Sequence, residues 1–292
     1  MSQSVLLNTR TTAQFEPTMV LFHGKCPDGF GAAWVFWRWL QQLAVYIPVS
    51  HGQQLPSVRH HHVIMVDVSF PKPLLDSLVR QTKQFQLLDH HHSAHHELKD
   101  APYAHFDLER SGIGLAWQFV HGDLALPQLA EVIQKRDLSQ PLTEEEEAVL
   151  HVLDTQGYDF EAWDRLMTRC EEQWDSVVQE GQWMRKKFIA LGERLIENAM
   201  PLSLHGLTGW VANTPKEFSS YVAFKLTEWG DFGLTWYTDE SGVVHLSFRS
   251  SKVNVVPLAQ HFGGGGGERS AGARLSLHEW ALFLGQQRNQ SV

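Results

Sequence analysis

Residues 62–91 read HVIMVDVSFPKPLLDSLVRQTKQFQLLDHH, and this stretch decides the fold. Two short apolar runs, His62–Val68 and Phe85–Leu88, flank a stretch with helical spacing from about Pro73 to Gln84. Short continuous apolar runs separated by a helix are typical of parallel strands that are covered on both faces of a sheet. The stretch therefore predicts a strand–helix–strand unit with an aspartate, Asp67 or Asp89, where each strand ends.

The residues upstream repeat the same alternation. Thr18–His23 is an apolar run between Pro17 and Gly24, and Val45–Val49 is another. Between them the sequence DGFGAAWVFWRWLQQL has apolar positions at helical spacing, and Asp28 is expected to cap the start of that helix. Residues 18–90 are thus expected to form an α/β domain with a parallel sheet.

The rest of the chain divides into helices followed by a second mixed region. Helices are predicted over 111–120, over 127–135 with Pro127 in its first position, from a Thr143 cap, and over 159–199 as one helix or a pair. Strands are then predicted over 207–211, 232–237 and 243–249, with helices over 219–229 and 256–262. We therefore expect three parts: a metal-binding catalytic domain at 1–155, a helical connector at 156–201 and a smaller α/β domain at 202–292.

Composition and charge exclude several classes of protein. The 292 residues include 24 Lys and Arg against 33 Asp and Glu, a net charge of −9, which argues against a protein that coats long nucleic acid or duplex DNA. Two cysteines cannot form a disulfide framework. Met1–Pro17 has no apolar segment typical of a signal peptide, and no apolar run is long enough to cross a membrane. A cytoplasmic protein is expected.

Histidines and acids gather at four points that follow strands or helices. Eight of the 17 histidines lie in two clusters, His60–His62 and His90–His96. The four candidate motifs are His23 with Asp28, then Asp67, then Asp89-His90-His91, then Asp137. Ligands bind at the carboxyl ends of the strands in open α/β sheets, so distant motifs can converge there. Carboxylates mixed with imidazoles suit Mn²⁺, Mg²⁺ or Fe²⁺, and a carboxylate such as Asp67 can bridge two ions.

Each of these residues also has an ordinary interpretation. His23 alone could be a packed or solvated histidine, and Asp137 could pair only with Lys135 or Arg136. The triplet His60–His62 precedes its strand and is expected in a solvated turn. The ordered set of four motifs favours a site over these separate interpretations.

VDVSF followed by LLDHHHSA resembles the DHH phosphoesterases, which include the RecJ exonuclease, nanoRNases and family II pyrophosphatases. The resemblance implies hydrolysis with two divalent ions, Mn²⁺ first, with Mg²⁺, Fe²⁺ or Co²⁺ as alternatives. It implies that His23 and Asp67 hold one ion and that His91 faces the phosphate. It assigns the other ion to Asp28, Asp67, His90 and Asp137. Cys26 stands where the family commonly has an aspartate, and a thiolate is a softer ligand.

The C-terminal sequence LSFRSSKVNVVPLAQHFGGGGGERSAGAR resembles the DHHA1 domain that accompanies the DHH domain in the exonuclease and nanoRNase branch. The resemblance implies substrate-binding residues there, namely Arg249, Ser250, Gly265, Gly266, Gly267, Glu268 and Arg269. Glycines let backbone N–H groups approach an anion closely, and arginine can pair with a phosphate. Glu268 stands where the family commonly has histidine.

The sequence as a whole predicts a phosphodiesterase that cleaves short oligonucleotides, such as the linear diribonucleotides pGpG or pApA, to mononucleotides. A homodimer is one possible assembly. A pyrophosphatase or exopolyphosphatase would share the metal site but usually has a different second domain. A nucleotide-binding sensor with a degenerate metal site is the alternative that Cys26 and Glu268 favour. A structural or storage protein with incidental histidine clusters does not account for the ordered motifs.

Overall fold

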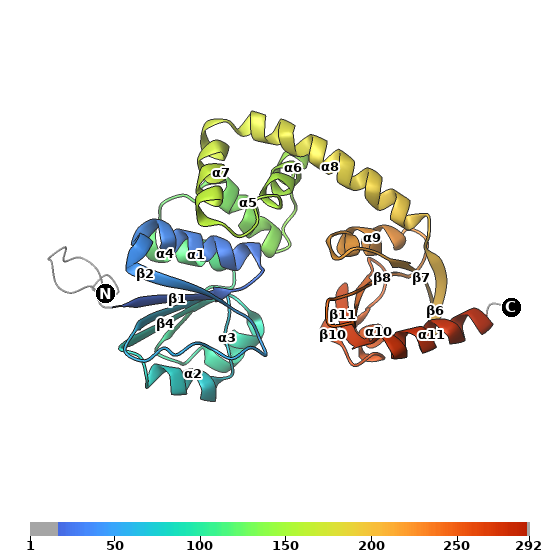
Figure 1. The fold of residues 1–292 in the computed structure, drawn as a ribbon, viewed down its shortest axis with the longest axis horizontal. Coiled ribbons are helices and arrows are strands. Elements are labelled where there is room, and N and C mark those ends of the chain that lie inside the picture. The colour runs from blue at the N-terminus through green and yellow to red at the C-terminus, as the bar shows by residue number, and fades with distance from the viewer. Residues whose placement is uncertain (1–16, 291–292) are drawn as a thin grey trace. The chain divides into compact units, whose positions relative to one another are not determined.

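The computed structural model describes residues 17–290 (Figure 1), so the expected absence of a signal peptide concerns residues outside the described part. The chain divides into two compact units, one that ends at Arg185 and one that begins at Lys186. This boundary falls inside the long helix α8, Trp174–Ile196. The expected connector residues 156–185 therefore belong to the first unit, whereas the rest of the connector belongs to the second.

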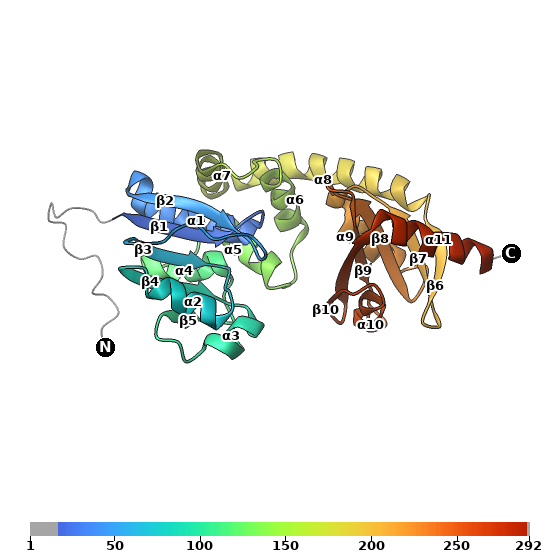
Figure 2. The same cartoon turned by 60° about the horizontal axis from the view of Figure 1, so that its bottom comes forward.

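The first unit contains a five-stranded sheet in the order β2-β1-β3-β4-β5, and every neighbouring pair is parallel. Figure 2 shows the strands in this order. They are β1 (Thr18–His23), β2 (Ala44–Val49), β3 (His62–Val66), β4 (Gln84–Asp89) and β5 (Ala104–Phe106). The predicted parallel α/β fold is confirmed. The sequence did not predict β5, which has three residues and only partial burial.

Helices cover both faces of this sheet (Figure 1). Helices α1 (Pro27–Leu40) and α4 (Gly112–His121) pack on the face that carries Val20 and Phe22, whereas α2 (Lys72–Val79) and α3 (His92–Leu98) pack on the other face. Successive residues of a strand point to opposite faces, so a strand buried on both sides is apolar throughout. Burial on both faces therefore explains the uninterrupted apolar runs in the sequence.

Four further helices enlarge the first core: α5 (Gln128–Asp137), α6 (Glu144–Leu153), α7 (Phe160–Glu172) and the beginning of α8. The predicted Thr143 cap is confirmed, because its side chain accepts a hydrogen bond from Glu146 N and the Glu146 side chain bonds back to Thr143 N. Residues 159–199 contain two helices, α7 and α8, so of the two alternatives the pair is confirmed. Pro127 precedes α5 instead of occupying its first position.

The second unit has a six-stranded sheet in the order β10-β11-β9-β8-β7-β6, in which only β7 and β8 are parallel. Its elements are β6 (Met200–Leu204), β7 (Leu207–Asn213), η2 (Lys216–Phe218), α9 (Ser219–Leu226), β8 (Phe232–Thr238), β9 (Val243–Arg249), α10 (Val256–Gln260), β10 (Gly265–Gly267), β11 (Ser270–Ser276) and α11 (Leu277–Gln290). Helices α10 and α11 cover one face and α9 part of the other.

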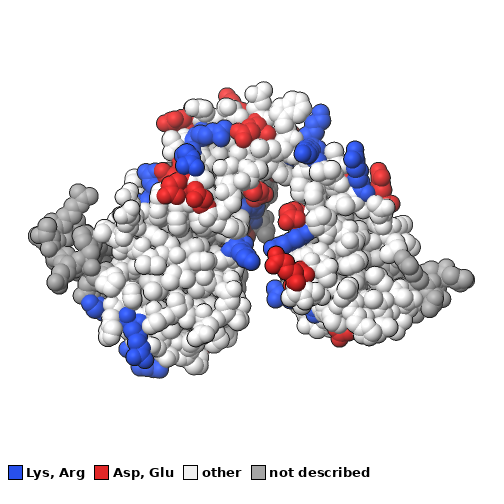
Figure 3. Space-filling view, in the orientation of Figure 1, with Lys and Arg blue, Asp and Glu red and all other residues white. Residues whose placement is uncertain are grey.

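Figure 3 shows basic and acidic side chains interspersed on the exposed face of each unit, with no continuous basic band on that view of the described residues. Within residues 17–290, no helix has the length and apolar character needed to span a bilayer.

Candidate metal centre

The strand register brings the predicted motifs to one edge of the first sheet. Phe22 lies opposite Val66, and Val66 lies opposite Leu88, across three adjacent parallel strands. The next residue on each strand is therefore His23, Asp67 or Asp89, in a row at the carboxyl edge. Parallel pairing thus explains why motifs separated by more than 60 residues share one site.

Asp67 and His90 lie at the middle of the cluster. Oδ1 of Asp67 lies 3.2 Å from Nε2 of His90, and Oδ2 lies 3.3 Å from Nδ1 of His23. Nε2 of His90 also lies 3.3 Å from Oδ2 of Asp137 and 3.9 Å from Oδ2 of Asp28. All five residues that the resemblance implied as metal ligands therefore meet here. Asp137 pairs with His90, whereas Lys135 pairs with Glu131 and Glu146, and Arg136 with Asp154.

The sequence predicted Asp28 as the cap of α1, and this prediction is wrong. Cys26 is the capping residue and Pro27 begins the helix, so Asp28 lies within the first turn. Its carboxylate is buried and accepts hydrogen bonds from Ser111 Oγ at 2.6 Å, from Gly112 N, and from Ile113 N at 3.0 Å. The N-terminus of α4 therefore holds this carboxylate at the centre, and the positive end of the helix dipole favours its charge.

Within the Asp89-His90-His91 triplet, Asp89 supports the two histidines from behind. Oδ1 of Asp89 accepts hydrogen bonds from His90 N at 2.8 Å and from His91 Nδ1 at 2.6 Å. Asp89 is fully buried, whereas 47% of the His91 side chain is exposed. Because Nδ1 of His91 is held by Asp89, its Nε2 is the ring nitrogen left for a substrate.

The donor groups suit a divalent cation. Ligand atoms lie within 4.8 Å of one another in three sets: His23, Cys26 and Asp67; Asp28, His90 and Asp137; and Asp67, Asp89, His90 and His91. Oδ2 of Asp67 and Oδ2 of Asp89 are buried without a regular hydrogen bond. A buried carboxylate oxygen without a well-aligned donor, as at Asp67 Oδ2 despite His23 at 3.3 Å, is unfavourable unless a cation neutralises it. Asp67 and His90 each occur in two of these sets, so neighbouring sets share a ligand residue.

Crowded charges shift the ionisation of this cluster. Burial raises the pKa of Asp28 well above its usual range, and the neighbouring Asp67 and Asp137 carboxylates add to this effect. Burial alone would raise the pKa of Asp67, but His23 and His90 together lower it. Burial opposes protonation of His90, yet the surrounding carboxylates raise its pKa to about 9. Without a cation, the cluster therefore retains protons that a cation would displace.

Two glycines allow the cluster to be this compact. A Cβ at Gly29 would lie 2.5 Å from His23 O and 2.9 Å from Asp67 Oδ2. A Cβ at Gly112 would lie 2.5 Å from Asp67 Cβ and 2.7 Å from Asp28 Oδ2. Sequence reasoning missed the roles of Ser111 and Gly112, and their only signal was that a predicted helix begins with Ser-Gly.

The His60–His62 triplet lies apart from this centre. His60 is exposed in a turn with a φ of 63°, and His62 is the first residue of β3, at the opposite end of the strand from Asp67. None of the three belongs to a candidate metal group in the described part of the chain.

In the second unit, Arg249 and Ser250 have different surroundings. The Arg249 guanidinium donates to Ser220 Oγ at 2.9 Å, to Ser247 Oγ at 3.0 Å and to Phe248 O. Within residues 17–290, no carboxylate lies within ion-pair distance of it. Ser250 is buried, donates to Asp231 O, and accepts hydrogen bonds from the amides of Lys252 and Val253. Its hydroxyl therefore has its donor and both acceptor positions occupied within the protein.

Part of the glycine run forms a strand, because it pairs with a neighbouring strand. Gly265–Gly267 form the short strand β10, which pairs with β11. The amides of Gly263 and Gly264 donate to Gln260 O and Ala259 O. The backbone carbonyls of Glu268 and Arg269 accept hydrogen bonds from Val255 N and Ser250 N. The glycine-rich segment is thus a strand and tight turn, with the side chains of Glu268 and Arg269 exposed.

The chain was compared with known families and proteins. No known family profile matches it. The uncharacterized protein R106 of Acanthamoeba polyphaga mimivirus is 28% identical over 88% of this chain and 67% of the viral protein.

Two solved structures share the fold. The pGpG-specific phosphodiesterase PggH from Vibrio cholerae is 14% identical and superposes over 94% of this chain and 98% of its own, with a TM-score of 0.54. RecJ from Thermus thermophilus, solved in complex with Mn²⁺, is 18% identical over 95% of this chain, with a TM-score of 0.52. This chain spans about half of that RecJ, 52%. This chain therefore shares its fold with these two proteins.

Proposed function

We propose that this protein is a metal-dependent phosphodiesterase that cleaves short oligonucleotides, in particular linear diribonucleotides, to mononucleotides. The observation that carries the proposal is the cluster of donor sets that share Asp67 and His90 at the carboxyl edge of the sheet. The fold shared with a pGpG-specific phosphodiesterase and with an Mn²⁺-bound RecJ supports this choice of chemistry.

We assign two divalent ions to the cluster, with Mn²⁺ as the preferred metal. His23 and Asp67, with Cys26 beside them, would hold one ion, and Asp28, Asp67, His90 and Asp137 would hold the other. Bound divalent ions lower the pKa of coordinated water to about 7 and stabilise charge on phosphoryl oxygens. The protein supplies the fixed carboxylates: the amide groups at the start of α4 hold Asp28, and the turn after β3 holds Asp67.

His91 is placed to donate a proton to the phosphate. Its contact with Asp89 holds Nδ1–H and raises the pKa of the imidazole, which favours the protonated ring, whose Nε2–H can donate. The exposure of the ring leaves it accessible to a ligand. A positioned donor of this kind stabilises charge that develops on a non-bridging oxygen.

The second unit would recognise the substrate. We assign this role to Arg249 and to the segment Gly265–Arg269, as the family resemblance implies. Ser250 would act indirectly, because its hydrogen bonds fix the loop that follows β9. The carboxylate-free surroundings of Arg249 leave its charge available to a phosphate.

The test is a substrate panel with Mn²⁺: a linear dinucleotide, a longer RNA, a cyclic dinucleotide, pyrophosphate and polyphosphate. The proposal predicts the highest kcat/KM on the linear dinucleotide and loss of turnover in EDTA. Preference for pyrophosphate or polyphosphate would replace it with phosphoanhydride hydrolysis. Binding of dinucleotides without turnover at any metal concentration would replace it with the sensor function.

A further inference from the structure

A cavity of about 540 Å³ lies wholly within the first unit. Side chains from α1, α4 and α7 line it (Figure 1), together with Pro127. We call it the Trp117 pocket, and its volume is within the range of pockets that bind small organic ligands. Arg38 of its lining lies ten residues beyond Asp28 on α1, which is about 15 Å along the helix. The Trp117 pocket is therefore separate from the candidate metal centre.

Each of the three helices presents a pair of residues to this pocket. The pairs are Trp34 and Arg38 on α1, Trp117 and His121 on α4, and Thr168 and Glu172 on α7. The members of each pair are four positions apart, and residues at this spacing lie on the same face of a helix. Three helix faces therefore converge on one cavity. The proposed hydrolysis uses none of these residues.

The aromatic part of the lining consists of three indoles and one imidazole: Trp34, Trp39, Trp117 and His121. The rings of Trp117 and His121 lie with their centroids 4.0 Å apart. Nε1 of Trp34 donates to Asp164 Oδ1 at 3.1 Å, and Nε1 of Trp117 donates to Leu124 O at 3.0 Å. These hydrogen bonds fix both indoles, so they offer a ligand their π surface and not a donor.

The charges at the Trp117 pocket favour a cation. The Arg38 guanidinium is paired with Asp164 at 2.7 Å, so its charge is balanced. Burial, with a smaller contribution from Arg38, lowers the pKa of His121, which keeps the imidazole neutral at pH 7. Glu171 and Glu172 also line the pocket, and neither has an ion-pair partner within residues 17–290. Two uncompensated carboxylates therefore remain beside the aromatic rings.

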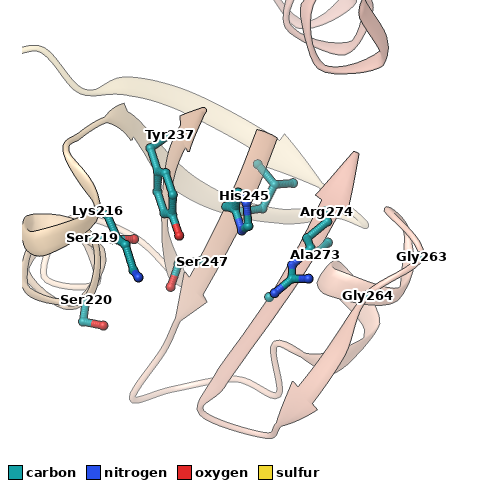
Figure 4. A pocket seen from close by; sticks show the side chains of 12 residues that line it. Lys216, Ser219, Ser220, Tyr237, His245, Ser247, Gly263, Gly264, Ala273 and Arg274 are labelled. Carbon is teal, nitrogen blue, oxygen red and sulfur yellow. The ribbon is translucent and has the colours of Figure 1, made fainter. Parts of the chain in front are cut away.

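A cavity in the second unit has the opposite charge. Lys216 and Arg274 line it (Figure 4), and none of its described lining residues is a carboxylate. It also has an aromatic wall, in which the rings of Tyr237 and His245 stack with their centroids 4.8 Å apart. Aromatic surface is thus common to both cavities, whereas the carboxylates belong to the Trp117 pocket. A ligand that prefers one cavity to the other is therefore expected to do so by its charge.

We propose that the Trp117 pocket binds a small organic ammonium ion, which its tryptophan rings and the carboxylates of Glu171 and Glu172 hold together. A cation over the face of an aromatic ring is attracted by the negative π surface, and tryptophan is the best ring for this contact. Quaternary ammonium groups suit such a surface, because they carry their charge inside an apolar shell. The two carboxylates are exposed and add attraction for the approaching cation.

The first experiment compares probes of similar shape and different charge. Choline is the cation, its carbon isostere with a tert-butyl group in place of trimethylammonium is the neutral probe, and the anion of tert-butylacetic acid is the third. The full chain is titrated in EDTA while NMR follows its indole N–H signals. Choline should shift the signals of Trp34, Trp39 and Trp117 and bind roughly tenfold more tightly than the neutral isostere.

Three results of this titration would overturn the proposal. Equal affinities for choline and the neutral isostere would mean that the pocket does not select charge. Tighter binding of the anion would mean that Arg38 and not the two carboxylates determines the ligand. Shifts confined to tryptophans outside the pocket would place the cation elsewhere in the chain.

The second experiment uses variants to locate the site. Glu172→Gln should weaken choline binding roughly threefold and leave the neutral isostere unaffected. Trp39→Leu should weaken choline binding roughly fivefold, and it leaves the core intact because Trp39 is 36% exposed. The matched controls are Glu161→Gln, on α7 but outside the pocket, and Trp229→Leu, an exposed tryptophan of the second unit. Both controls should bind choline as the wild type does. Unchanged choline binding in both Glu172→Gln and Trp39→Leu would contradict the assignment.

Discussion

The two units carry opposite excesses of charge where their ligands are expected. In the first unit, Asp28, Asp67 and Asp89 are at most 2% exposed and crowd one sheet edge. In the second, Lys216 and Arg274 face a cavity that no carboxylate lines. Buried or converging charges of one sign are unfavourable unless a ligand of the other sign is present. The comparison is in line with the cations proposed for the first unit and favours an anionic group at the second, although the whole chain has a net charge of −9.

The largest effect is expected at Asp67, which contacts both His23 and His90. Asp67→Ala should abolish hydrolysis, by a factor of at least about 10³, because both proposed ions lose a shared ligand. Since Asp67 has a φ of 59°, Asp67→Asn is the better variant for folding, because asparagine tolerates this backbone region. The assay is dinucleotide turnover with Mn²⁺, with Asp100→Asn as a surface control. Normal turnover in a folded Asp67→Asn protein would remove the two-metal mechanism.

His91 tests whether the centre has a phosphate-facing donor that is separate from its ligands. His91→Ala should lower kcat by roughly 10²–10³, the usual effect of losing one such donor, with little change in bound metal. Metal content by mass spectrometry and kcat are measured together. His92→Ala is the matched control, because His92 is the exposed neighbour that begins α3. Equal losses of metal and of rate would instead make His91 a metal ligand.

The pH dependence of metal binding tests the charge of the first unit directly. In the metal-free protein the pKa of His90 is about 9, so below that pH a bound proton must leave before the imidazole can coordinate. The affinity for Mn²⁺ should therefore rise about tenfold per unit from pH 7 toward 9 and then level off. Calorimetric titrations at several pH values give the slope. An affinity that does not change over this range would contradict the proposed role of His90.

Arg249 tests whether the second unit recognises the substrate separately from the metal centre of the first unit. Arg249→Ala should lower dinucleotide kcat/KM roughly 10- to 100-fold, because the phosphate loses its arginine partner; each factor of ten corresponds to about 1.4 kcal/mol. The same variant should leave hydrolysis of bis-p-nitrophenyl phosphate nearly intact. On the proposed division of roles, the small ester would require only the metal centre, whereas the dinucleotide would also require the second unit. Both substrates are assayed with the wild type and the variant. Equal losses on both would mean that Arg249 supports the fold or the first unit.

The smallest effect is expected at Cys26. Burial raises the pKa of its thiol to about 12 in the metal-free protein, so only a bound cation would stabilise the thiolate. Cys26→Asp should raise turnover with Mn²⁺ relative to Co²⁺ by a few-fold, because a carboxylate is the harder ligand. The Co²⁺-loaded wild type should show a sulfur-to-cobalt charge-transfer band that Cys26→Ser lacks. The same band in Cys26→Ser would exclude the thiol as a ligand.

The parallel core of the first unit could be predicted because strands buried on both faces are apolar throughout, as β1 and β3 are. Convergence of His23, Asp67 and Asp89 followed from the parallel order. Strands β5, β6, β10 and β11 were missed. β5 is short and half-buried, and β6 contains Pro201, which a strand accepts at a sheet edge.

The parts of the sites that depend on tertiary packing could not be predicted. Asp28 followed the common pattern of a helix cap, but the amides of α4, more than 80 residues away in the chain, determine where it lies. The glycine run reads as a loop by composition, whereas pairing with β11 makes part of it a strand. Lys216 and Arg274 carried no signal, because only the fold brings residues of η2 and β11 to one cavity.

The central claim is that one cluster in the first unit holds two catalytic ions around Asp67. Anomalous diffraction from crystals of the full chain grown with Mn²⁺ tests it most directly. We predict two manganese peaks about 3.5–4 Å apart, one beside His23 and the other beside Asp28, His90 and Asp137, with Asp67 between them. A single peak, or manganese bound elsewhere in the chain, would contradict it.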